Sequence, residues 1–164
     1  MSRNLYFICP TDNLESIINS TFNEENYFVT SLANSVTLNR ELVKELFSII
    51  KSKKINHVTF ILSDNNTIVL DALRSKNFKD IRGLGSFYER IEKHKCYVDS
   101  VWCSSDIQQI IISYILNHKK REFENLINSS VKQLNINAII YNSHRDEFSK
   151  VRGELLSLDF FNLN

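Results

Sequence analysis

The residues of this sequence that could do chemistry are sulfur-bearing or polar side chains that follow apolar runs typical of β-strands. Candidates for one ligand-binding pocket are Cys9, Asp12, Ser31, Asn34, Ser63, Asp64, Asn65 and Asn66. If the strands before them are neighbours in a parallel sheet, their carboxyl ends bring these side chains to one edge, where open α/β sheets bind ligands. The sequence therefore predicts a polar pocket that contains a thiol, carboxylates and several amides.

This pocket offers hydrogen-bond donors and acceptors but no acid–base pair tuned near neutral pH. A reactive thiolate at Cys9 would need a nearby cation or helix N-terminus, and the helix expected to begin near Asp12 could provide one. The histidines His57, His118 and His144 fall in a strand, a helical pattern and a turn, and none is placed to assist nucleophilic catalysis. The sequence identifies no catalytic residue.

Several candidates also have a structural interpretation. Cys9 ends an apolar strand and fits a buried, small apolar side chain. Asp12 with Glu15 fits a capping box at a helix start. Asn66 or Thr67 fits the cap of the next helix, so the loop after the third strand is expected mainly to start that helix.

Alternating strand and helix patterns predict an α/β fold. The expected strands are Leu5–Cys9, Tyr27–Thr30, His57–Leu62, Ile136–Tyr141 and an antiparallel return strand, Glu147–Val151. Helical patterns follow the first three strands, and Asn39 is expected to cap the second helix. This order predicts three layers: a mostly parallel β-sheet with helices on both faces and an antiparallel edge strand near the C-terminus. With one proline and three glycines, the chain shows no linker, so residues 1–164 are expected to form a single domain.

Within the segment Arg74–Trp102, which has no clear strand or helix pattern, the stretch "IRGLGSFY" holds two of the three glycines and is expected to be a turn-rich excursion. On a strand there, His94 and Cys96 would face one side. The spacing of Cys96 and Cys103 does not match that of compact zinc sites, so we expect no metal site in this segment.

A long helical pattern follows this segment. Ser105 with Gln108 fits a capping box, and apolar residues then keep the helical period from Ile107 to Leu134. The pattern fits one helix, or two that meet near His118.

The order of these pieces resembles that of the β-class carbonic anhydrases over most of the chain. In that family the first strand ends in C-x-D-x-R and the second leads into A-G-N. The third ends in an H-x-x-C loop that opens a helix, and a final strand "H-G-x-x-Y-D" turns back on itself. The corresponding stretches here are "YFICPTDNL", "YFVTSLANSV", "VTFILSDNNTIV" and "INAIIYNSHRDEFSKV". The resemblance implies the same fold and a homo-oligomer built on dimers.

The resemblance also implies a zinc site, and here the chain departs from the family. There, the cysteine of the first motif and the histidine and cysteine of the third hold a zinc ion that makes hydroxide at neutral pH. Of these three ligands only the first cysteine has a counterpart in this chain, which is Cys9. One residue too many separates Cys9 from Asp12, and the arginine of the motif is missing after Asp12. Within Ser63–Thr67 the other two ligands are replaced by side chains that bind zinc poorly. Asn34 matches the final asparagine of A-G-N, which is not a zinc ligand.

We therefore predict a non-catalytic carbonic-anhydrase-like domain that binds a small ligand or a protein partner at the carboxyl ends of the strands, without a cofactor. Two alternatives stay open, because fold alone does not fix function. One is an enzyme of different chemistry that uses Cys9 and Asp12 at the same place. The other is a residual zinc-dependent carbonic anhydrase with rebuilt ligands.

The composition limits which kinds of binding partner and which cellular compartment we expect. A net charge of +1 gives no field that would attract nucleic acid or an anionic membrane. No apolar run reaches the ~18 residues that span a membrane, and no signal peptide is recognised. With three cysteines and no export signal, we expect reduced thiols and a cytoplasmic protein. The apolar "LDFFNLN" at the C-terminus, with Tyr6 and Phe7 near the other end, is compatible with a homodimer contact.

Overall fold

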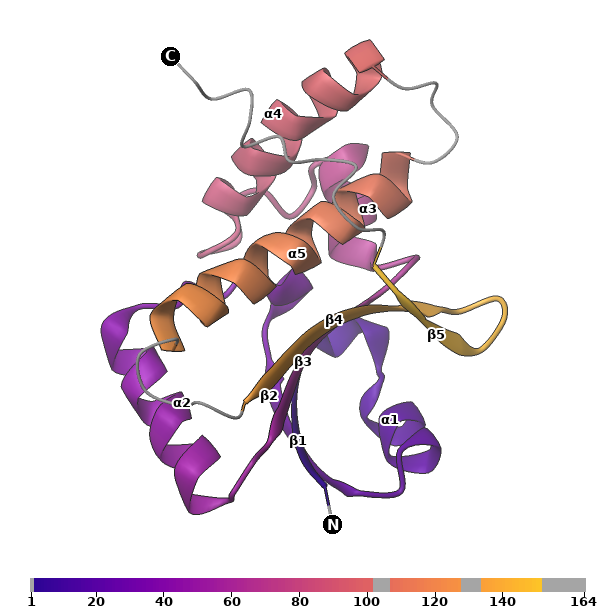
Figure 1. Cartoon of the computed structure of the whole chain (residues 1–164). Helices are drawn as coiled ribbons and strands as arrows, with labels where there is room; N and C mark the ends of the chain where they lie inside the picture. Colours follow the sequence, from indigo (N-terminus) through magenta and orange to yellow (C-terminus); the bar gives the residue numbers. More distant parts are fainter. Residues whose placement is uncertain (1, 102–106, 128–133, 152–164) are drawn as a thin grey trace.

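Figure 1 shows the computed structural model of the chain, which describes residues 2–101, 107–127 and 134–151. The strands are β1 (Arg3–Ile8), β2 (Glu25–Thr30), β3 (His57–Ser63), β4 (Asn135–Asn142) and β5 (Glu147–Lys150). The α-helices are α1 (Glu15–Thr21), α2 (Arg40–Ser52), α3 (Thr67–Leu73), α4 (Gly85–Val101) and α5 (Ile107–Ile127). Two short 3₁₀ helices, η1 (Pro10–Asp12) and η2 (Leu32–Asn34), follow β1 and β2.

All five strands form one sheet in the order β2-β1-β3-β4-β5. β1 to β4 are parallel and β5 is antiparallel to β4. The predicted α/β fold with an antiparallel edge strand is therefore confirmed. The chain adds β2 on one side of β1 and then β3 on the other, so the direction of the crossover reverses between β1 and β3.

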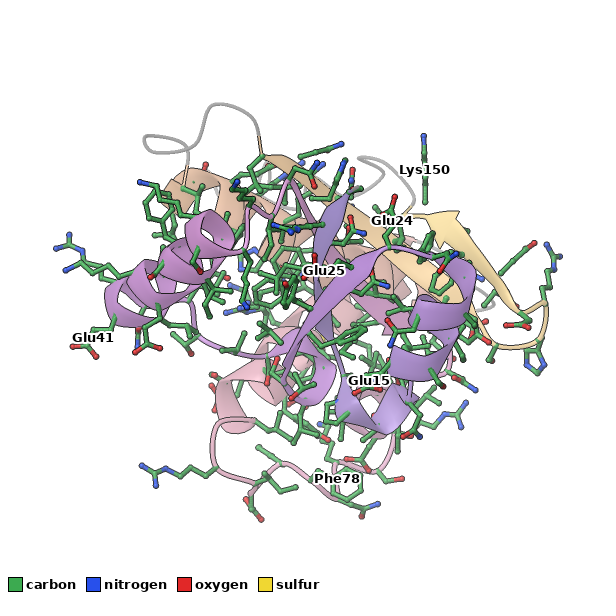
Figure 2. The ribbon with its side chains drawn as sticks, turned by 90° about the horizontal axis from the view of Figure 1, so that it is seen from below. Glu15, Glu24, Glu25, Glu41, Phe78 and Lys150 are labelled. Atoms are coloured by element: carbon green, nitrogen blue, oxygen red, sulfur yellow. The ribbon has the colours of Figure 1, made fainter. Side chains whose placement is uncertain are left out.

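The two faces of the sheet carry cores of unequal size, because successive side chains of a strand point to opposite faces. Phe7 and Phe60 lie in the larger core, with ring centroids 4.5 Å apart, while Tyr6 and Ile61 lie in the smaller core. Helices α2 to α5 contribute to the larger core and α1 to the smaller one. Figure 2 shows α1 and α2 on opposite sides of the sheet, with Glu41 of α2 pointing away from the body.

The burial of the first strand corrects one expectation about assembly. Tyr6 is 5% exposed and Phe7 is fully buried, both in the chain's own cores. These two side chains are therefore not available for a contact between subunits. The stretch "LDFFNLN" lies outside the described residues.

The helix caps differ in whether sequence predicted them. Asn39 caps α2 as expected, since its side chain accepts a hydrogen bond from the Leu42 N–H at 2.9 Å. The capping box of Asp12 and Glu15 is wrong: α1 begins after Leu14 without a side-chain cap, and Asp12 ends η1. The carboxylate of Asp12 instead accepts hydrogen bonds from Ser63 and Asn66.

The turn-rich excursion is the largest error of the sequence-based prediction. Only the stretch before Gly85 is rich in turns, with Gly83 at a φ of 93°. α4 then forms because Leu84, Tyr88 and Ile91 recur at helical spacing and are buried. His94 and Cys96 lie on this helix, not on a strand, and residues two apart on a helix point to different sides. Cys103 and Ser105 lie outside the described residues.

Helix α5 continues past His118 without a break, so the long pattern is one helix up to Ile127. None of the helices in the described segments is long and apolar enough to cross a membrane.

A buried carboxylate fixes α4 against α3. Asp71 of α3 accepts hydrogen bonds from the Tyr88 hydroxyl at 2.6 Å and from the Asn77 and Phe78 amides at 3.1 Å each. Burial by itself raises the pKa of Asp71, but these donors outweigh it and hold that pKa below its usual value. One ionised side chain thus helps to hold α4 against α3, together with the apolar packing of Tyr88 and Ile91.

Candidate functional site

The edge at which the sequence predicts a pocket is the place where β1 and β3 stop pairing. Their parallel register ends at Phe7 and Phe60, and the side chain of Asn34 from η2 enters between the strands beyond that point. Its Nδ2 donates to the carbonyls of Phe7 at 3.3 Å and Ile61 at 2.9 Å. Asn34 is 1% exposed, so it bridges the two strands from within the protein.

Cys9 faces the same segment from the end of β1. The thiol is fully buried, and its Sγ accepts a hydrogen bond from the Ala33 N–H at 3.1 Å. The Thr11 hydroxyl lies 3.0 Å from the same sulfur. Ala33 and Asn34 both have a left-handed backbone, with φ of 49° and 55°. Such strain in residues other than glycine persists only where surrounding contacts impose it.

Asp12 connects the end of β1 to the loop after β3. Its Oδ2 accepts from the Ser63 N–H at 2.8 Å, and its Oδ1 accepts from Asn66 Nδ2 at 2.7 Å. Asn66 in turn caps α3, because its Oδ1 accepts from the Val69 N–H at 3.0 Å. The predicted cap at Asn66 is therefore confirmed, and the same side chain also fixes Asp12.

The carboxyl group of Asp12 is partly desolvated. Burial raises the pKa of Asp12, the two hydrogen bonds lower it, and the nearby Asp64 carboxylate raises it again. The net effect is a raised pKa, because desolvation is the largest contribution.

Asp64 is directed away from Asp12, towards the turn after β4. Its Oδ1 accepts from the Ser143 N–H at 3.2 Å and the Ser143 hydroxyl at 3.0 Å. Its backbone carbonyl accepts from Gln108 Nε2 of α5. Sequence reasoning missed both partners; the turn signal "NSHRD" after the last strand could have indicated Ser143.

The remaining candidates differ in exposure. Asn65 is exposed and accepts a hydrogen bond from the Ser63 hydroxyl at 2.5 Å. The Ser31 hydroxyl is buried and, like the Asn34 Oδ1, has no hydrogen-bond partner among the described residues. Buried polar atoms normally have partners, so these two atoms are exceptions at this edge.

Comparison with solved structures identifies the class of the fold. The wild-type β-carbonic anhydrase CafD of Aspergillus fumigatus is 14% identical, with a TM-score of 0.73 over 93% of this chain and 90% of that one. A tetrameric β-carbonic anhydrase of Sordaria macrospora is 11% identical, with a TM-score of 0.72 over 92% and 80%. The Coccomyxa β-carbonic anhydrase is 12% identical, with a TM-score of 0.68 over 92% and 72%. No family model and no curated protein matches the sequence.

The chain therefore has a divergent β-carbonic-anhydrase-like fold, as the sequence resemblance predicted. At these identities the likeness shows the fold alone.

The side chains at this edge do not fit the zinc ion that the fold implies. No group of three or more His, Cys, Asp or Glu side chains within the described segments could hold a metal ion. Near Cys9 the groups that could act as metal ligands are hydroxyls, amides and one carboxylate. That carboxylate already accepts hydrogen bonds from Ser63 and Asn66. Hydroxyls and carboxamides are poor replacements for thiolate and imidazole.

The burial of Cys9 predicts low reactivity. We expect iodoacetamide at neutral pH to alkylate Cys96 well before Cys9 in the folded protein, since Cys96 is exposed while Cys9 is buried and hydrogen-bonded. Mass spectrometry of peptides from timed reactions measures each site separately, and labelling in urea is the control. Faster labelling of Cys9 than of Cys96 in the folded protein would favour the enzyme alternative.

The bridge from Asp12 predicts both a stability loss and a pH dependence. Asp12→Ala leaves the Ser63 N–H and the Asn66 amide without acceptors, so we expect a loss of about 1–3 kcal/mol in the free energy of unfolding. Because the pKa of folded Asp12 is raised, its contribution to stability decreases as pH rises from about 3.9, its unfolded value, through the folded pKa.

The loss in free energy of unfolding caused by Asp12→Ala should therefore be larger at about pH 3.9 than above the folded pKa of Asp12. Urea unfolding across that pH range measures it, with Asp80→Ala, at an exposed aspartate, as the matched control. A deficit equal to that of the control would show that Asp12 does not hold these elements together.

Proposed function

We propose that the chain is a single-domain, non-catalytic carbonic-anhydrase-like protein that binds a small ligand or a protein partner at the carboxyl ends of β1, β2 and β3. The observation that carries the proposal is the state of Asp12, whose carboxylate is occupied by Ser63 and Asn66. These two residues have the H-x-x-C spacing: Ser63 ends β3, and Asn66 caps the helix that follows. Hydrogen bonds thus join the elements that a shared zinc ion joins in the family that the sequence resembles.

Two buried atoms support the ligand-binding half of the proposal. The Ser31 hydroxyl and the Asn34 Oδ1 lie at the same edge and have no partner among the described residues. A ligand that donates to Asn34 and either donates to or accepts from Ser31 would satisfy both. Neither alternative function has an observation of this kind in its favour, because Cys9 is buried and no rebuilt set of zinc ligands is found in the described segments.

Zinc content tests the proposal. We expect less than about a tenth of a zinc ion per chain in untagged protein purified without chelator, and no hydration of carbon dioxide. The double variant Ser63→His with Asn66→Cys should gain zinc, since it returns imidazole and a second thiolate opposite Cys9. Metal analysis by mass spectrometry gives both results.

The matched control shifts the same pair by one residue, to Asp64→His with Thr67→Cys, and should stay without zinc. Adding Cys9→Ser to the first double variant should remove the metal again. About one zinc ion per wild-type chain would contradict the proposal and would favour a residual carbonic anhydrase.

We also propose a cytoplasmic homo-oligomer, most simply a dimer. The support is the resemblance to a family built on dimers, together with the tetrameric Sordaria macrospora enzymes of the same fold. Light scattering of the full chain at micromolar concentration should give a mass of at least twice 19.2 kDa. A monomer would contradict this part of the proposal and leave the first part untouched.

A further inference from the structure

A cavity lies on the larger-core face, between α4, α5 and the segment that follows η2. Its volume is about 80 Å³, which is room for a few water molecules or one small ligand. The floor is apolar and formed by Phe87, Ile91 and Ile115. The walls carry polar side chains: Ser35, Thr37, Ser86, Arg90, Tyr114, His118, Lys119 and Glu122. None of the eight candidates from the sequence lines this cavity.

A buried lysine forms one wall. Lys119 is 6% exposed, and its Nζ donates to the Val36 carbonyl at 2.7 Å and to Glu122 Oε2 at 2.9 Å. An ammonium group has three donors, and the third has no partner among the residues that the structure describes. Since Lys119 lines the cavity, that donor is available to a ligand there.

Arg90 makes the cavity net positive. Glu122 neutralises Lys119 through their ion pair, so the guanidinium of Arg90 is left without a compensating carboxylate. Within the described part of the chain, Arg90 has no hydrogen bond or ion pair of its own. Ser86 lies one turn before Arg90 on the same side of α4, so its hydroxyl and the guanidinium face the cavity together.

The start of α4 adds to this field. Ser86 and Phe87 lie in the first turn of a 17-residue helix, whose first amides have no acceptor within the helix. There is no acidic residue in that turn, so the positive end of the helix dipole is not offset there. Figure 1 shows α4 and α5 lying one beside the other above the sheet, which brings this helix end close to Lys119.

We infer that this cavity is a binding site for a small oxyanion of the phosphate or sulfate class. Arg90 provides the uncompensated charge, Lys119 provides a desolvated donor, and Ser35, Thr37 and Ser86 provide hydroxyl donors. The cavity volume admits the anionic group itself and little more, which favours a free inorganic anion over the phosphate of a larger molecule. The inference depends neither on the proposed function at the carboxyl ends of β1, β2 and β3 nor on zinc binding.

Isothermal titration calorimetry of the full chain with inorganic phosphate at constant ionic strength tests the site. We expect one phosphate per chain, with sulfate competing and chloride without effect. Arg90→Gln, at an exposed position, should weaken phosphate binding at least about tenfold. Arg82→Gln, at an exposed arginine outside the cavity, should leave binding unchanged.

A second variant keeps the test independent of Arg90. Ser86→Glu places a carboxylate in the first turn of α4, which suits the helix dipole, so the variant should fold while its charge excludes the anion. Phenyl phosphate distinguishes the source of the phosphate group, since it should bind more weakly than inorganic phosphate. Absence of phosphate binding to the wild-type protein, equal binding to Arg90→Gln, or tighter binding of phenyl phosphate would each overturn the inference.

Discussion

The divergence of β1 and β3 at their carboxyl ends is the constraint from which the rest of the candidate site follows. The two strands pair as far as Phe7 and Phe60, and the carbonyls beyond that point need other donors. The Asn34 carboxamide supplies them by donating to Phe7 and Ile61 at once. A buried carbonyl without a donor costs about 1–3 kcal/mol, so η2 is held in its strained left-handed conformation by these bonds.

Beyond the bridge that Asn34 makes, the residues after each strand face one another across the gap. Cys9 meets the backbone of η2, and Asp12 meets Ser63 and Asn66. This arrangement closes the edge of the sheet with hydrogen bonds between elements that are distant in sequence. Under the proposed function, those bonds give the structural cross-link that a zinc ion would give in the family that the sequence resembles.

The unequal cover of the two faces explains why the cavity beside Arg90 and Lys119 lies on the larger-core face. On the smaller face, α1 packs directly on Tyr6, Ile8 and Ile61. On the larger face, α5 lies over β3 and β4, and α4 lies against α3 and α5. Asp71 fixes α4 at the α3 side through Tyr88. The start of α4 therefore faces the polar side of α5, and the space between them has polar and charged walls over an apolar floor.

The sequence by itself determined the elements whose signals are local. Continuous apolar runs such as His57–Leu62 identified the strands, and Asn39 identified the start of α2, because the acceptor and donor of that cap are three residues apart. The role of Asn66 as a cap followed for the same reason. The family resemblance also came from the sequence. The stretches that follow successive strands occur in the same order as in that family, although no single motif is intact.

Only the tertiary structure decided what depends on contacts between distant residues. Asp12 has the local pattern of a helix cap, but its partners Ser63 and Asn66 lie 51 and 54 residues away, so no short window could show them. Helix α4 was missed because the glycines before Tyr88 suggested turns, whereas burial against α3 and α5 stabilises a helix there. The cavity beside Arg90 and Lys119 has the same origin: α4, α5 and the segment after η2 carry no shared motif, and only their packing brings these side chains together.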